Sequence, residues 1–148
     1  MVVSVIQPRG ICARALVGWY GLYQAGHLIS NGIYLMNPGD PPFPPPPNGW
    51  SDQLVGFLNG MAAADFVNAA LALGFVYGYF RQRAWWFWLG TLTLTISVYA
   101  SVVFTVGTVY VGAWTDHVVQ YVLFYVPFIP VIVLFALLPC WNPRRLDE

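Results

Sequence analysis

The sequence contains four apolar stretches that are each long enough to cross a lipid bilayer. They cover residues 11–36, 54–80, 85–111 and 118–138, and a hydrocarbon layer about 30 Å thick needs only about 20 such residues in a helix. Charged residues make up 8% of the chain, whereas the surface of a soluble domain needs about a quarter. The sequence therefore predicts an all-α fold, a polytopic membrane four-helix bundle that forms a single domain over residues 1–148.

The charged residues predict how this bundle is oriented. The basic residues lie at the start of the first stretch, between the second and third, or after the fourth: Arg9, Arg14, Arg81, Arg83, Arg144 and Arg145. Asp40, Asp52 and Asp116 lie in the other two connections. Because cytoplasmic loops are enriched in basic residues, both termini are expected in the cytoplasm. The predicted location is the endoplasmic reticulum membrane or a bacterial inner membrane.

Charge and cysteine content exclude two classes of function. The net charge is zero and the chain has no basic run, so a nucleic-acid partner is not expected. The two cysteines, Cys12 and Cys140, are far apart, and no Cys/His cluster has the spacing of a metal site. No metal and no cofactor are therefore expected.

A proline-rich segment, residues 37–53, joins the first two stretches on the predicted outer side. Each proline fixes φ and removes a backbone donor, so the run from Pro38 to Pro47 is expected to form a polyproline II rod. This rod could be a stiff spacer. Alternatively, since it carries Phe43 and leads to Trp50, it could cover the outer mouth of the bundle as a lid.

Asp65 is the carboxyl group that lies well inside one of the stretches. Ionisable groups at such depth are costly and therefore indicate function. Counting 1.5 Å per residue from the outer helix ends places Asp65 about 16 Å deep and His27 of the first stretch about 14 Å deep. The two side chains are therefore expected to meet near the middle of the bilayer.

Other polar side chains extend this match between the helices. Gln24, His27 and Asn31 are spaced to share one face of the first helix. Asn59 and Asn68 lie on the second helix, and hydroxyl groups follow on the third and fourth. The predicted ligand-binding residues are Gln24, His27, Asn31, Asn59, Asp65, Asn68, Ser101, Thr105, Tyr121 and Tyr125.

The alternative is that these polar groups hold the helices together. Hydroxyl side chains at helical spacing often join membrane helices by hydrogen bonds. The third stretch carries such a stripe in Ser97, Ser101, Thr105 and Thr108. Gly56, Gly60 and Ala64 have the spacing of a small-residue packing strip.

In the fourth stretch, Pro127 and Pro130 are expected to bend the helix level with Asp65, which would open space for a pocket.

Asp65 is the residue with the strongest indication of function. An asparagine would serve helix packing at a lower desolvation cost than a carboxyl group. Asp65 could receive a cationic ligand, donate a proton to an apolar substrate, or relay protons with His27. Asp65 and His27 are therefore the candidate catalytic residues, and the question of enzymatic activity stays open.

The pattern resembles the EXPERA family, four-helix membrane proteins that include the emopamil-binding sterol isomerase and the sigma-2 receptor. The resemblance rests on Gly26-His27-Leu28-Ile29, Trp50, Asp65-Phe66-Val67, Tyr125-Val126-Pro127 and Pro130. It implies cytosolic termini, a pocket entered sideways from the lipid, and binding of sterols or amphiphilic amines with Asp65 as the acidic contact. The sequence departs from the sterol isomerases at Met61, where they carry a histidine.

The leading interpretation is a membrane protein that binds a sterol-like lipid or an amphiphilic amine in an intramembrane pocket centred on Asp65 and His27. Isomerase-type acid chemistry would extend this function. The alternative is an accessory or assembly subunit of a larger membrane complex, in which the polar residues and glycines are docking surfaces. A homo-oligomer that conducts protons or small solutes ranks last, because the inner halves of the first and fourth stretches lack polar groups.

Overall fold

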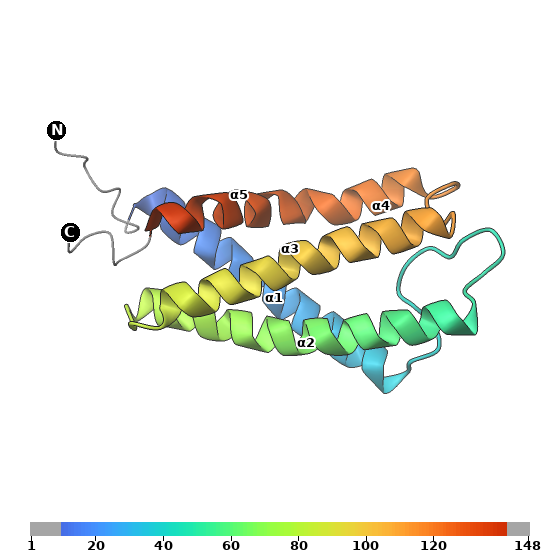
Figure 1. Cartoon of the computed structure of the whole chain (residues 1–148), viewed down its shortest axis with the longest axis horizontal. Coiled ribbons are helices and arrows are strands. Elements are labelled where there is room, and N and C mark those ends of the chain that lie inside the picture. The colour runs from blue at the N-terminus through green and yellow to red at the C-terminus, as the bar shows by residue number, and fades with distance from the viewer. Residues whose placement is uncertain (1–9, 142–148) are drawn as a thin grey trace.

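The computed structural model describes residues 10–141, and this part of the chain is almost entirely helical. Its helices are α1 (Ile11–Met36), α2 (Asp52–Phe80), α3 (Trp86–Tyr110), α4 (Val118–Tyr125), the 3-10 helix η1 (Val126–Phe128), α5 (Ile129–Leu137) and the 3-10 helix η2 (Leu138–Trp141). The segments from α4 to η2 follow one another as a single rod (Figure 1). The described chain is therefore an up-and-down bundle of four helical rods, which confirms the predicted all-α fold.

Three of the four rods are long and apolar enough to span a membrane: Asp52–Phe80, Trp86–Tyr110 and Val118–Trp141. Helix α1 has 26 residues and the predicted bounds, but polar side chains lower its hydropathy and it is not among the three. Part of that polarity is turned inward, since Gln24 is only 1% exposed. Helix α1 thus uses its polar face inside the bundle.

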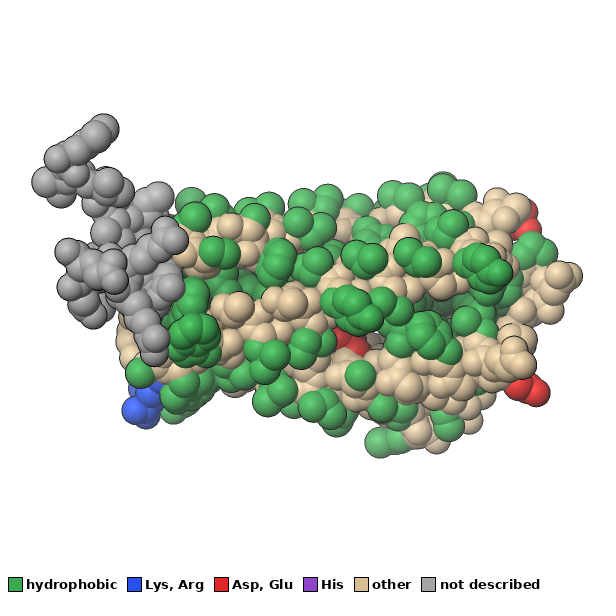
Figure 2. All heavy atoms as spheres, in the orientation of Figure 1, with side chains coloured by type: hydrophobic (Ala, Val, Ile, Leu, Met, Phe, Trp, Pro, Cys, Tyr) green, Lys and Arg blue, Asp and Glu red, His purple; other side chains and the backbone are tan. Residues whose placement is uncertain are grey.

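Large apolar side chains cover the outside of the bundle along its length (Figure 2). Ile33 of α1, Tyr99 of α3 and Leu123 of α4 are all more exposed than buried. Soluble monomers rarely expose contiguous apolar surface of this extent. Helices that span a membrane present such a surface to the lipid. The exterior and the three apolar rods together indicate a membrane protein.

Charged side chains of opposite sign lie at opposite ends of the bundle. The described arginines lie where α1 begins and where α2 turns into α3: Arg14, Arg81 and Arg83. Asp52 and Asp116 lie at the other end, where α2 begins and where α3 connects to α4 (Figures 1 and 2). Arg9, Arg144 and Arg145 lie outside the described residues. The separation of charge along the bundle follows the sequence pattern.

The arginine-bearing end of the bundle is closely packed. Phe75 and Tyr79 of α2 are buried, and their ring centroids lie 6.4 and 5.4 Å from that of Trp86 in α3. Gly90 lets α3 come close to α2, because a Cβ atom there would lie 2.6 Å from the ring of Phe75. From this end the two helices diverge toward the other end of the bundle (Figure 1).

The fourth rod changes its helix type where its prolines lie. Pro127 and Pro130 have no N–H to donate. The 3-10 helix η1 contains Pro127 and separates α4 from α5, which contains Pro130. The indole nitrogen of Trp19 in α1 donates to the carbonyl oxygen of Pro127 at 2.9 Å. Helix α1 therefore supplies a donor at the point where the fourth rod is interrupted.

The proline-rich segment does not form the predicted straight rod. The chain turns at residues 38–39 and bends at residue 40 and again at residues 42–43. It reaches across to the ends of α3 and α4 before it returns to α2 (Figure 1). The prediction of a rod is wrong because proline restricts its own φ but leaves Gly39 and Phe43 free to turn the chain.

Two anchors hold this segment against the bundle. The ring of Phe43 packs against Phe104 of α3 and Phe124 of α4, with centroids 4.8 and 5.5 Å away. The hydroxyl of Tyr121 in α4 donates to the carbonyl oxygen of Pro44 at 2.8 Å. Burial of an aromatic ring and the hydrogen bond of a buried tyrosine therefore decide the path of the segment.

Gly56 and Gly60 do not pack against other parts of the described chain. A Cβ atom added at either position would meet nothing within 4 Å, and both residues are exposed on α2, as is Ala64. The predicted packing strip is therefore wrong for contacts within residues 10–141. Other glycines lie at close helix contacts: a Cβ atom at Gly90 would lie 2.6 Å from Phe75, and one at Gly21 would lie 3.3 Å from Val76.

Replacing Gly90 by alanine is expected to destabilise the protein, because the new methyl group overlaps the buried ring of Phe75. Overpacking of this kind costs about 1–3 kcal/mol. Unfolding of the purified protein in detergent, followed by tryptophan fluorescence, measures the loss. Gly60→Ala is the matched control and should leave stability unchanged or raise it, since alanine favours a helix more than glycine does. Equal losses for the two variants would contradict the prediction.

Candidate functional site

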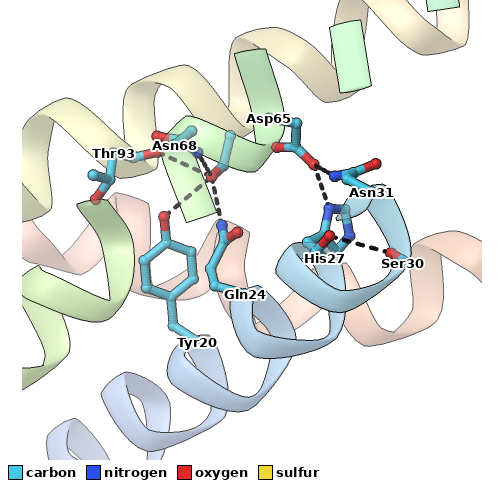
Figure 3. A network of polar contacts seen from close by, with 9 residues as sticks. Tyr20, Gln24, His27, Ser30, Asn31, Asp65, Asn68 and Thr93 are labelled. Atoms are coloured by element: carbon cyan, nitrogen blue, oxygen red, sulfur yellow. Dashed lines mark hydrogen bonds and ion pairs between the residues drawn. The ribbon is translucent and has the colours of Figure 1, made fainter. Parts of the chain in front are cut away.

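Asp65, near the middle of α2, meets His27 of α1 (Figure 3). The His27 Nδ1 atom lies 2.6 Å from Asp65 Oδ2, which is a hydrogen-bond distance. The side chains of His27 and Asp65 are 37% and 19% exposed, which leaves the pair partly accessible. The contact predicted by counting helix depth is confirmed.

Two further residues of α1 position this pair. Asn31 donates from Nδ2 to the same Asp65 Oδ2 atom at 2.8 Å. The ring of Tyr23 lies against the imidazole of His27, with centroids 4.4 Å apart. Tyr23, His27 and Asn31 lie one turn apart on one face of α1. That face therefore fixes both the carboxyl group and the imidazole.

The pair lines a cavity of about 520 Å³. All four rods and the proline-rich segment contribute to its wall. Figure 2 shows acidic atoms inside a hollow on the face of the bundle between α2 and α3, and Asp65 is the acidic residue of the cavity wall. The cavity thus opens sideways, onto the apolar surface of the bundle.

The wall of the cavity is mostly apolar and aromatic, with a small polar part. Its apolar side includes Trp19, Tyr23, Met61, Phe104, Leu123 and Phe128. Its polar side includes Gln24, His27, Asn31, Asp65, Ser97 and Ser101. Ligand pockets have volumes of about 300–1,000 Å³ and combine an apolar lining with a few convergent polar groups. This cavity has both properties.

Ser97 of α3 is the centre of a second polar cluster, whose members Tyr20, Gln24, Asn68 and Thr93 are labelled beside the first cluster in Figure 3. Gln24 Nε2 and Asn68 Nδ2 donate to Ser97 Oγ at 2.9 and 3.0 Å. Ser97 donates to the carbonyl oxygen of Thr93 at 2.9 Å, and the hydroxyl of Tyr20 lies 3.1 Å from Ser97 Oγ. One hydroxyl group therefore joins α1, α2 and α3.

The sequence pattern includes Ser97 in the hydroxyl stripe but does not single it out as a site residue. Ser97 and Ser101 have the same hydropathy and lie on the same stripe, so these properties cannot show which of the two belongs to a site. The signal that could have found it is depth, because Gln24 and Asn68 lie level with each other and need a shared partner on the third helix. Applying the depth count to three helices together would point to Ser97.

Gln24 and Asn68 each keep a buried oxygen without a donor. They are 1% and 2% exposed, and neither Gln24 Oε1 nor Asn68 Oδ1 has a hydrogen-bond partner in the part of the chain that the structure describes. The single proton of Ser97 is directed to a carbonyl, so both amides must present N–H to Ser97 and turn their oxygens away. Gln24 lines the cavity and Asn68 does not.

The other predicted ligand-binding residues divide into two groups. Ser101 and Tyr125 line the cavity, whereas Asn59, Thr105 and Tyr121 do not. The hydroxyl of Thr105 pairs with that of Tyr125, which joins α3 to α4. Asn59 and Tyr121 both donate to backbone carbonyls of the proline-rich segment. These three residues thus have structural partners that depth alone does not reveal.

Within residues 10–141, no group of three or more His, Cys, Asp and Glu side chains is placed to hold a metal ion. Comparisons of the chain with protein families, with curated proteins and with solved structures find no match. Function is therefore argued from the cavity and its polar groups.

Replacing Ser97 by alanine is expected to destabilise the bundle by about 1–3 kcal/mol, because the buried N–H groups of Gln24 and Asn68 lose their acceptor. Denaturant unfolding in detergent measures the change. Ser101→Ala is the matched control, since its hydroxyl bonds only to the carbonyl of Val98 on the same helix, at 2.8 Å. A loss in Ser101→Ala as large as in Ser97→Ala would refute a special role for Ser97.

Proposed function

We propose that this protein is an integral membrane protein that binds an amphiphile in the cavity beside Asp65 and His27. In this proposal all four rods cross the bilayer, with the arginine-bearing end and both termini on the cytoplasmic side. One observation carries it: a partly exposed carboxyl–imidazole pair lines an apolar cavity halfway along an apolar bundle. The apolar part of the ligand would contact the aromatic wall, and its polar head would contact Asp65.

The route into the cavity supports an amphiphile rather than a water-soluble ligand. The hollow lies on the side of the bundle, among exposed apolar residues (Figure 2). In a membrane this face would meet acyl chains. A ligand dissolved in the bilayer could reach the cavity without passing through water.

The chemistry of Asp65 favours a ligand head that is cationic or donates hydrogen bonds. His27 and Asn31 both contact Oδ2, and Oδ1 has no hydrogen bond to any described residue. A hydrogen bond from an ammonium group to a carboxylate is about twice as strong as a neutral one. An amphiphilic amine therefore suits the site, and the hydroxyl group of a sterol-like lipid would supply a weaker donor.

Kinship with the EXPERA family remains a prediction, and so does acid chemistry of the isomerase type. The short contact between His27 and Asp65 supports the second idea. A proton donor must lie within hydrogen-bond reach of the group it serves, and this pair could hold and replace a proton at the edge of the cavity.

Asp65→Asn is expected to weaken binding of a long-chain primary amine about tenfold or more, because the charge-assisted hydrogen bond is lost. Titration of the purified protein in detergent, read by the fluorescence of Trp19 in the cavity wall, gives the dissociation constant. Asp116→Asn, at an exposed position in the α3–α4 connection, is the control and should bind as the unchanged protein does. An unchanged dissociation constant for the amine in Asp65→Asn would contradict the proposal.

An accessory subunit of a larger membrane complex is the competing function. Mild detergent extraction followed by native mass spectrometry separates the two. A lone chain that carries lipid supports the binding proposal, whereas partner chains in fixed ratio support the accessory role.

The orientation can be tested with the two native cysteines. Cys12 and Cys140 are both exposed and lie at the arginine-bearing end. In sealed vesicles with the cytoplasmic face outward, a membrane-impermeant maleimide should label both. As the control, Asp116→Cys in a Cys12→Ser, Cys140→Ser background should be labelled only from the opposite face. The reverse pattern would overturn the orientation.

A further inference from the structure

The proline-rich segment supplies one part of the cavity wall. Among the described residues of that wall, Pro42 and Phe43 are the two that lie outside the helices. The ring of Phe43 contacts Phe104 of α3 and Phe124 of α4, and both of these residues also line the cavity. Because the segment lies at the end of the bundle opposite the arginines (Figure 1), Phe43 forms the wall of the cavity at that end.

The backbone on both sides of Phe43 restricts where its ring can lie. Pro42 and Pro44 flank it, each with a fixed φ, and a residue that precedes a proline is itself limited to extended conformations. The hydroxyl of Tyr121 donates to the carbonyl oxygen of Pro44 at 2.8 Å, and the ring of Tyr121 is stacked on that of Trp114 with centroids 5.1 Å apart. A ligand that reaches Phe43 therefore meets a ring whose backbone is held in place.

The character of the cavity wall differs on the two sides of Asp65. Toward the arginine-bearing end the wall includes the amide of Gln24 and the hydroxyl of Ser97. Toward the proline-rich segment, Leu58 lies two turns of α2, or about 10 Å, beyond Asp65. The wall on that side consists mainly of large apolar side chains: Pro42, Phe43, Leu58, Met61, Phe104 and Phe124. An apolar tail that starts from a head group at Asp65 would therefore be matched by the wall toward Phe43.

We infer that Phe43 is a specificity-determining residue that limits the length of the ligand's apolar tail. The ammonium head of an alkyl amine binds Asp65, its tail lies toward the proline-rich segment, and the ring of Phe43 forms the end wall. A longer tail overlaps this ring, and overpacking of a closely filled space is unfavourable. This inference rests on the proposed binding function and adds a limit of chain length to it.

The test measures the binding of unbranched primary amines of increasing chain length to the full chain in detergent micelles. Isothermal titration calorimetry gives each dissociation constant, expressed as the mole fraction of amine in the micelle, so that partition of longer chains into detergent is not counted as binding. Beyond a limiting length the affinity of the unchanged protein is expected to fall about tenfold, as an overpacked contact predicts. An affinity that falls at no length would show that the tail leaves through the opening on the side of the bundle, and would overturn the inference.

Two substitutions at Phe43 should move this limit in opposite directions. Phe43→Ala removes the ring and should let longer amines bind, whereas Phe43→Trp enlarges the ring system and should shorten the limit. A general loss of stability does not produce opposite shifts. Phe57→Ala is the matched control, because Phe57 lies near the same end of the bundle and is exposed but does not line the cavity. It should keep the limit of the unchanged protein.

The outcomes separate this inference from the proposed function. If amines bind but the limit does not change with the residue at position 43, or if Phe57→Ala moves the limit as far as Phe43→Ala does, the inference fails and the proposed function stands. If no amine binds the unchanged protein, both fail. Where Phe43→Ala does not fold, Phe43→Leu decides the matter: its smaller side chain should lengthen the limit by a smaller amount, and an unchanged limit would overturn the inference.

Discussion

Hydrocarbon offers no partner to a polar side chain, so each polar group within a membrane bundle must find one on another helix or on a ligand. Asp65 has the greatest need for such a partner, because it carries a carboxyl group. His27 and Asn31 both form hydrogen bonds with one of its oxygens, Oδ2. These contacts require α1 to turn its polar face toward α2. Helix α1 is the least apolar of the four rods, and its polar side chains form hydrogen bonds inside the bundle.

Features that depend on position along a helix were predictable from the sequence. The bounds of α1 agree with the first apolar stretch. The other rods differ from theirs by one to three residues, at both ends for α3 and at one end for α2 and the fourth rod. The contact of His27 with Asp65 followed from the constant rise of the α-helix and the opposite directions of consecutive helices. Because the geometry of an α-helix is regular, the depth of a residue can be predicted over many residues.

Features that depend on rotation about a helix axis, or on a loop, were not predictable in this way. Asn68 lies at a suitable depth and bonds to Ser97 of the cavity wall, but Asn68 itself does not line the cavity. Tyr121 likewise lies on the face of α4 that meets the proline-rich segment. The path of that segment depends on Phe43, whose contacts with α3 and α4 are distant in sequence. Depth alone does not distinguish these directions.

The cavity lies between two packed regions, one at each end of the bundle. At the arginine-bearing end, Gly90 and Phe75 bring α2 and α3 together. At the other end, where α2 and α3 have diverged, Phe43 packs against α3 and α4. Between these points the small side chains of Ala62 and Ala100 form part of the wall and leave the space open. Larger apolar residues there would fill the volume and add stability, since unfilled space destabilises a protein core. Both the open volume and the carboxyl group beside it reduce the stability of the protein. A bound ligand that fills the volume and forms a hydrogen bond with the carboxyl group would offset both costs.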